Sequence, residues 1–75
     1  MKLEELFANV LSEPISNLSD STGPNTLKAW DSYFHIQLIV AMEEKYAVNF
    51  TTDEIQEIQS IAKAKQLLRA KGVAL

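Results

Sequence analysis

The sequence contains no cysteine, so neither a disulfide framework nor a thiolate metal site can hold the chain together. It is also poor in backbone breakers, with two glycines and two prolines in 75 residues. Its longest apolar run, Leu38 to Met42, is far shorter than the ~20 residues that cross a bilayer. No charged leader with a small-residue cleavage site precedes that run. We therefore expect a cytoplasmic protein that does not insert into membranes.

The chain is long enough for one small domain. A domain of this size buries only about 60% of the surface that its unfolded chain exposes, so its core must be simple. Hydrophobic residues make up 47% of the chain and charged residues 23%, which is typical of a folded domain rather than a disordered one. We expect residues 1–75 to form a single domain and the protein to be a monomer.

Positive charge is scarce outside the C-terminal end. Residues 1–57 carry three basic and ten acidic side chains, whereas residues 58–75 carry four basic and no acidic ones, for a net charge of −3. An acidic body is a poor match for a phosphate backbone, so nucleic acid is not an expected partner. It suits a partner that presents Lys and Arg, while the basic end complements the dipole at a helix C-terminus.

Apolar residues recur at helical spacing, and no β-type alternation is present. The first stripe predicts a helix from about residue 2 to residue 12, which ends before Pro14. It consists of Leu3, Leu6, Phe7, Val10 and Leu11. A second helix is expected to begin at Asp31 or Ser32, since either side chain can cap a helix N-terminus.

Two further caps predict the remaining helices. Thr51 and Glu54 have the spacing of a capping box, which predicts a short helix from Thr52 to about Gln59. Ser60 can cap a last helix that ends near Gly72. The expected fold is an all-α four-helix bundle with a long first loop and a short third helix. Its predicted core includes Leu6, Phe7, Leu38, Met42, Tyr46, Ile61 and Leu67.

Turn-forming residues dominate from residue 13 to residue 30, which predicts one long loop. Loops longer than about 12–15 residues in a compact domain usually indicate either a functional segment or a wrong assignment of elements. We expect Ile15, Leu18 and Leu27 to attach this loop to the core, and Trp30 to anchor its end.

The predicted central helix has apolar residues on two neighbouring faces. One stripe runs from Leu38 through Ile39 and Met42 to Tyr46. The other contains Tyr33, Gln37, Val40 and Glu44. A helix that is apolar on more than one side is either central in a bundle or covered by a partner, and both can hold here.

The segment from Trp30 to Phe50 resembles the attachment segment of acyl carrier and peptidyl carrier proteins. Its Asp31-Ser32 pair opens an amphipathic run that ends in Ala41-Met42-Glu43-Glu44, followed by Tyr46 and Val48. The resemblance extends to the helix spacing on both sides. It implies that Ser32 carries a 4′-phosphopantetheine arm taken from coenzyme A, which makes the chain a phosphoprotein that holds its cargo as a thioester. It also implies that Asp31 belongs to the recognition signature of the modifying transferase.

The same resemblance implies a carrier rather than an enzyme. Its partners would be a phosphopantetheinyl transferase, a ligase that loads an acyl or aminoacyl group, and downstream transferases or synthases. The pathway would be fatty acid, polyketide or nonribosomal peptide biosynthesis. The residues expected to contact partners are Tyr33, Phe34, Gln37, Val40, Glu43 and Glu44.

The chain departs from the family pattern close to the serine. Tyr33 stands where leucine or methionine is usual, and Ala29 where glycine is common. Phe34 and Gln37 occupy positions at which carriers of fatty acid synthesis tend to have carboxylates. These departures argue against a housekeeping role in fatty acid synthesis. The Trp30-Asp31-Ser32 form, with His35 three residues after the serine, resembles stand-alone carriers of specialised biosynthesis or surface-polymer acylation.

Other interpretations remain open at this point. Taken alone, Asp31-Ser32 most often only caps a helix, which would make the protein a helical interaction adaptor with an unmodified serine. A helix-turn-helix nucleic-acid binder would need a basic recognition helix, which is not present. An enzyme is least favoured, because His35 has no base or nucleophile partner in the sequence pattern and is expected to be a half-buried packing residue. We expect no metal site, since Asp53, Glu54 and Glu57 lack a glycine-turned ligand loop.

Overall fold

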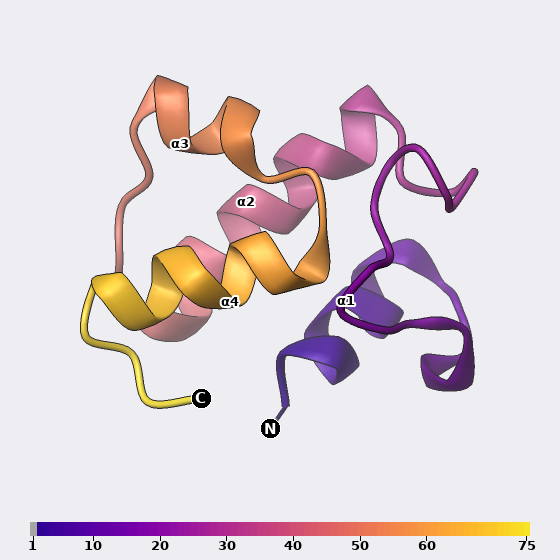
Figure 1. The fold of residues 1–75 in the computed structure, drawn as a ribbon, viewed down its shortest axis with the longest axis horizontal. Coiled ribbons are helices and arrows are strands. Elements are labelled where there is room, and N and C mark those ends of the chain that lie inside the picture. Colours follow the sequence, from indigo (N-terminus) through magenta and orange to yellow (C-terminus); the bar gives the residue numbers. More distant parts are fainter. Residues whose placement is uncertain (1) are drawn as a thin grey trace.

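The computed structural model describes residues 2–75 as an all-α bundle, as predicted (Figure 1). Its helices are α1 (Leu3–Leu11), α2 (Ser32–Tyr46), α3 (Thr52–Glu57) and α4 (Ile61–Ala70), with a 3-10 turn η1 (Ile15–Asn17) in the first loop. α4 crosses in front of α2, α3 lies above them, and the two chain ends lie on the same side of the bundle (Figure 1). No helix within residues 2–75 is long and apolar enough to cross a bilayer.

The predicted caps are present at three helix starts. Asp31 caps α2, Thr51 and Glu54 form the capping box of α3, and the Ser60 hydroxyl accepts the Lys63 N–H of α4 at 3.1 Å. α3 ends at Glu57 instead of about Gln59, because Ile58 leaves the helical conformation and is fully buried. Gly72 adopts a φ of +90° just after α4, the conformation expected of a terminating glycine.

Helices α1, α2 and α4 and the loops between the helices supply the buried core. Its largest fully buried side chains are Phe7, Trp30, Leu38, Met42, Ile58, Ile61 and Leu68. Leu67 and Tyr46 pack against this cluster but are only partly buried. The Tyr46 hydroxyl has no hydrogen-bond partner within the described chain. Burial, and secondly the negative charge of Glu4, raise the pKa of Tyr46.

The long first loop is attached to the bundle, although not by all the residues expected. Leu18 is buried and Leu27 packs against the core, as predicted. The prediction for Ile15 is wrong: this side chain is 47% exposed, because it lies on the surface turn η1.

The loop also binds the N-terminus of α4 through its backbone. The Ile61 N–H donates to the Thr22 carbonyl and the Ala62 N–H donates to the Asp20 carbonyl, both at 2.9 Å. These N–H groups lie in the first turn of α4, where no helical carbonyl is available to them. The loop therefore satisfies donors that the helix cannot satisfy itself.

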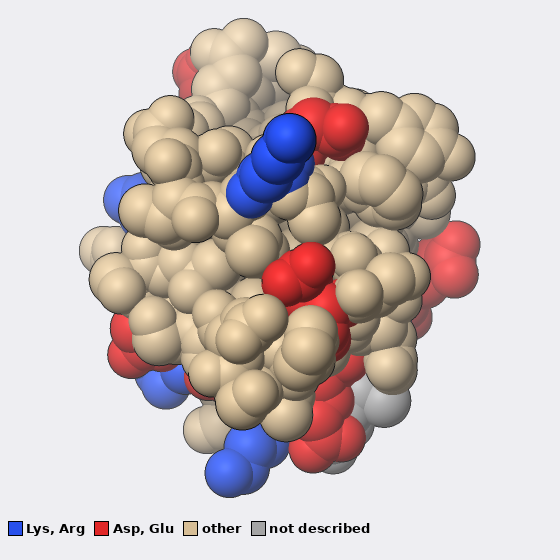
Figure 2. All heavy atoms as spheres, turned by 90° about the vertical axis from the view of Figure 1, so that its right-hand side faces the viewer, with Lys and Arg blue, Asp and Glu red and all other residues tan. Residues whose placement is uncertain are grey.

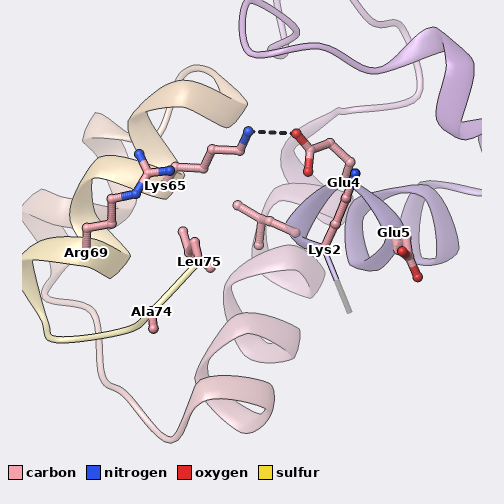
Figure 3. A pocket seen from close by; sticks show the side chains of 8 residues that line it. Lys2, Glu4, Glu5, Lys65, Arg69, Ala74 and Leu75 are labelled. Carbon is pink, nitrogen blue, oxygen red and sulfur yellow. Dashed lines mark hydrogen bonds and ion pairs between the residues drawn. The ribbon is translucent and has the colours of Figure 1, made fainter.

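An ion cluster of three side chains links α1, the first loop and α4. Lys65 on α4 contacts the Glu4 carboxylate at 2.7 Å and the Asp20 carboxylate at 2.6 Å. Figure 3 shows Lys65 reaching from α4 towards Glu4 on α1. The hydrogen bonds that Lys65 donates to Asp20 and then to Glu4 raise the pKa of Lys65, and the bond from Lys65 lowers the pKa of Glu4. Both shifts stabilise the charged forms of the cluster.

The close approach of the loop to the α3–α4 connection requires glycine at position 23. A Cβ on Gly23 would lie 2.0 Å from the Gln59 carbonyl oxygen, so Gly23→Ala must push the loop away from α4. We expect this substitution to lower the free energy of unfolding by about 3 kcal/mol or more, measured by urea denaturation.

Gly72→Ala is the matched control. A Cβ there meets no atom within 4 Å, so only the left-handed backbone conformation opposes it. The expected loss is about 1 kcal/mol. Equal losses for the two variants would show that the loop does not pack against Gln59 in solution.

Candidate functional site

At the start of α2, Asp31 caps the helix and Ser32 is the residue that follows the cap. The Asp31 carboxylate accepts the Phe34 N–H at 2.9 Å, and the Asp31 carbonyl accepts the His35 N–H at 2.8 Å. Ser32 is therefore the first helical residue, and its side chain is exposed. Because Asp31 supplies the cap, the Ser32 hydroxyl is not needed to start the helix.

Trp30 fixes the chain immediately before this turn. Its side chain is 1% exposed and meets the Phe7 ring of α1 edge-on, with the ring centroids 5.3 Å apart. The Trp30 side chain points into the core and the Asp31 carboxylate caps the helix. Ser32, the next residue, has its side chain exposed to solvent. The predicted role of Trp30 as the loop anchor is confirmed.

His35 joins three segments around the serine. It accepts the Trp30 indole N–H through Nδ1 at 2.9 Å, and its Nε2 lies 2.7 Å from the Ile55 carbonyl oxygen of α3. The planes of the His35 and Trp30 rings differ by only 22°, with the centroids 6.0 Å apart. His35 is partly buried, as predicted, but its contacts with the loop and with α3 could not be predicted from the sequence pattern.

A surface hollow of about 560 Å³ lies beside Ser32. Trp30 and His35 line it together with Asp31 and Ser32, and its other lining residues are Pro24, Ile36 and Gln59. Ile36 is 50% exposed and was missed from the sequence, because it belongs to neither of the two apolar stripes recognised on this helix. The hollow provides both apolar and polar contacts next to the hydroxyl.

The outer face of α2 is apolar in part. Tyr33 is 66% and Val40 42% exposed, whereas Phe34 is partly buried and packs edge-on against Tyr33. A second hollow of about 390 Å³ runs along this face and reaches Gln37 and Glu44. The sequence-predicted contact residues thus gather on one surface, with one exception described next.

Glu43 and Glu44 differ in their surroundings. Glu44 is exposed on the outer face of α2, whereas Glu43 is partly buried and accepts the Phe50 N–H at 2.9 Å. The Glu43 carboxylate therefore holds the α2–α3 connection, and Glu44 is the freer of the two charges.

The electrostatic surface is mixed. Figure 2 shows the side formed by the first loop and α1, where most of the surface is uncharged and the basic side chains are scattered. Among residues 2–75, no group of three or more His, Asp or Glu side chains is placed to hold a metal ion.

The residues at the start of α2 fit a phosphodiester-linked group. Ser32 is exposed, and the backbone N–H groups of the first helical residues have no helical acceptor. The positive end of the helix dipole favours an anion at this position. The adjacent hollow can receive the part of such a group that follows the phosphate.

Comparison with known proteins supports this interpretation. No protein-family model and no curated protein matches the sequence. Among solved structures, the chain is similar to the holo acyl carrier protein from Geobacter metallireducens, determined in solution by NMR. The two sequences are 28% identical, the TM-score is 0.74, and the match covers 97% of this chain and 90% of the other. The match confirms the resemblance to acyl carrier proteins, the four-helix fold and the expectation of a carrier in place of an enzyme.

The free energy of unfolding of alanine variants shows which of Asp31 and Ser32 caps α2. Asp31→Ala removes the oxygen that accepts the Phe34 N–H, so it should lower the free energy of unfolding by about 1 kcal/mol. Ser32→Ala should change it by less than about 0.5 kcal/mol, as is usual for an exposed site. Thermal unfolding of both variants checks this, and a larger loss for Ser32→Ala would assign the cap to the serine.

Proposed function

We propose that the protein is an acyl or aminoacyl carrier, and that Ser32 is the residue to which its 4′-phosphopantetheine arm is attached. The observation that carries the proposal is the position of Ser32: it is exposed at the first helical position, while Asp31 alone supplies the cap. Ser32 is thus available for modification at no cost to the helix. The likeness to a holo acyl carrier protein supports the same conclusion.

The attachment is a phosphoryl transfer from coenzyme A. The Ser32 oxygen bonds to the pantetheine-bearing phosphorus, and the pyrophosphate P–O bond breaks. Adenosine 3′,5′-bisphosphate leaves with the electron pair, and a base of the transferase takes the hydroxyl proton. This chain contributes the hydroxyl, the helix N-terminus that favours the added negative charge, and the Asp31 cap that fixes the turn. Once bound, the arm supplies a thiol that carries cargo as a thioester.

The partners are enzymes that modify, load and unload the arm. A phosphopantetheinyl transferase would recognise Asp31 and Ser32, and a loading ligase and downstream transferases or synthases would contact the outer face of α2. Tyr33, Val40, Gln37 and Glu44 are exposed on that face, while Phe34 and Glu43 contribute from partly buried positions. Apolar contact supplies affinity there, and the exposed carboxylate steers association.

The departures from the family pattern near the serine bear on the pathway that the carrier serves. Phe34 and Gln37 replace carboxylates that a basic docking surface would need, and Phe34 packs partly into the core. An enzyme that docks through charge would therefore find few anchors on the first turns of α2. This supports a role in specialised biosynthesis or surface-polymer acylation. The exposed apolar face alone would also suit a helical adaptor, which is the competing function.

Intact mass decides between a carrier and an adaptor. Incubation with coenzyme A and a broad-specificity transferase should add one group of roughly 340 Da to the wild-type protein, the mass of a serine-linked phosphopantetheine. Ser32→Ala should remain folded and gain nothing. Ser60→Ala, which removes a serine at another helix cap, is the matched control and should still be modified.

Two results would contradict the proposal. Modification of Ser32→Ala would place the arm on another serine. An unmodified wild-type protein, with a positive-control carrier modified in the same reaction, would favour the adaptor.

A further inference from the structure

The short helix α3 has little packing of its own. None of its six residues is fully buried, and Ile55 is only partly buried against the core. A helix this short is not stable in isolation, so contacts with the rest of the protein must hold it in place. Two polar contacts do so: Lys71 bonds to Glu54 at 2.9 Å, and His35 bonds to the Ile55 carbonyl at 2.7 Å.

The His35 contact admits one arrangement of protons. The indole nitrogen of Trp30 can only donate and the Ile55 carbonyl can only accept. Nδ1 must therefore be the acceptor and Nε2–H the donor, so the neutral Nε2-protonated imidazole satisfies both neighbours at once. The side chain is thus fixed at both ring nitrogens.

His35 is also part of the wall of the hollow beside Ser32. It lies one helical turn after the serine and lines the same hollow, whose other inner wall is the buried Trp30. Because the imidazole bridges α2 to α3, a chain that entered the bundle between these helices from the serine would have to displace it. Its displacement would break both hydrogen bonds.

We propose that His35 is a positioning residue that holds α3 against α2 and so keeps the cargo of Ser32 outside the helical core. The inference rests on the proposed attachment at Ser32. The hollow beside Ser32 has apolar lining residues such as Ile36 and Pro24 together with the polar Asp31 and Gln59, so it can receive a cargo group at the surface of the bundle.

Two substitutions of His35 each retain one of its two hydrogen bonds and remove the other. The side-chain amide of asparagine has its nitrogen and oxygen near the Nδ1 position, so His35→Asn can still accept from Trp30 but no longer reaches Ile55. His35→Gln extends its amide to the Nε2 position and can still donate to the Ile55 carbonyl. The glutamine variant is thus the conservative control.

Hydrogen exchange of the unmodified protein tests the contact with α3. Amides of residues 54–58 should exchange roughly tenfold faster in His35→Asn than in the wild type, as expected for the loss of one good hydrogen bond. His35→Gln should restore the slow rate. Unchanged exchange in His35→Asn would overturn the proposal, and this readout does not depend on the arm.

The placement of the cargo is tested by loading the wild type and both variants through the transferase from acetyl- and octanoyl-coenzyme A. In the wild type, the methyl NMR signals of Leu38, Ile58 and Ile61 should be the same for the two acyl forms. In His35→Asn the octanoyl form should shift these core signals. Core shifts in the wild type would overturn the proposal even if His35→Asn fails to fold.

Intact mass keeps the two proposals apart. Failure to attach any acyl arm to Ser32 would refute the proposed function and, with it, the proposed placement of the cargo. Attachment followed by core shifts in the wild type would refute only the role of His35.

Discussion

The burial of Trp30 at the end of the long loop is the interaction on which the position of Ser32 depends. Its indole ring fills the core against Phe7, and its N–H is satisfied by His35 in place of water. A buried indole without this partner would lose a hydrogen bond that water supplies to the unfolded chain. The chain direction at Asp31, the cap of α2 and the outward placement of Ser32 all follow from this anchor.

A domain of this size cannot rely on its apolar core alone. The structure adds backbone bonds from the first loop to the N-terminus of α4, made possible by Gly23, and the ion cluster around Lys65. These contacts lie on segments distant in sequence, so the long loop acts as a packed element.

Local patterns predicted most of the helices because their signals are local. The Thr51–Glu54 capping box, the Ser60 cap and the apolar stripe of α1 each depend on residues a few positions apart, and all three are present. Ser32 was predicted as the attachment residue because the segment from Trp30 to Phe50 resembles carrier proteins. The cap could not be assigned between Asp31 and Ser32, because both side chains carry a suitable oxygen.

Contacts between distant segments could not be predicted in the same way. The bond from His35 to Ile55 and the approach of Gly23 to Gln59 depend on how the loop folds back, which no periodicity records. Ile15 was placed inside on hydrophobicity alone, yet it lies on a surface turn. Ile36 was not predicted as a surface residue because it belongs to neither apolar stripe of α2. It lines the hollow together with Pro24 of the first loop and Gln59 of the α3–α4 connection.

The most direct test of the central anchor is the scalar coupling across the hydrogen bond from the Trp30 indole nitrogen to His35 Nδ1, measured by NMR on ¹⁵N-labelled protein. We expect a measurable ¹⁵N–¹⁵N coupling, a slowly exchanging indole proton and a neutral His35 protonated at Nε2. A rapidly exchanging indole proton without coupling, or a His35 protonated at Nδ1, would contradict the anchoring role of Trp30.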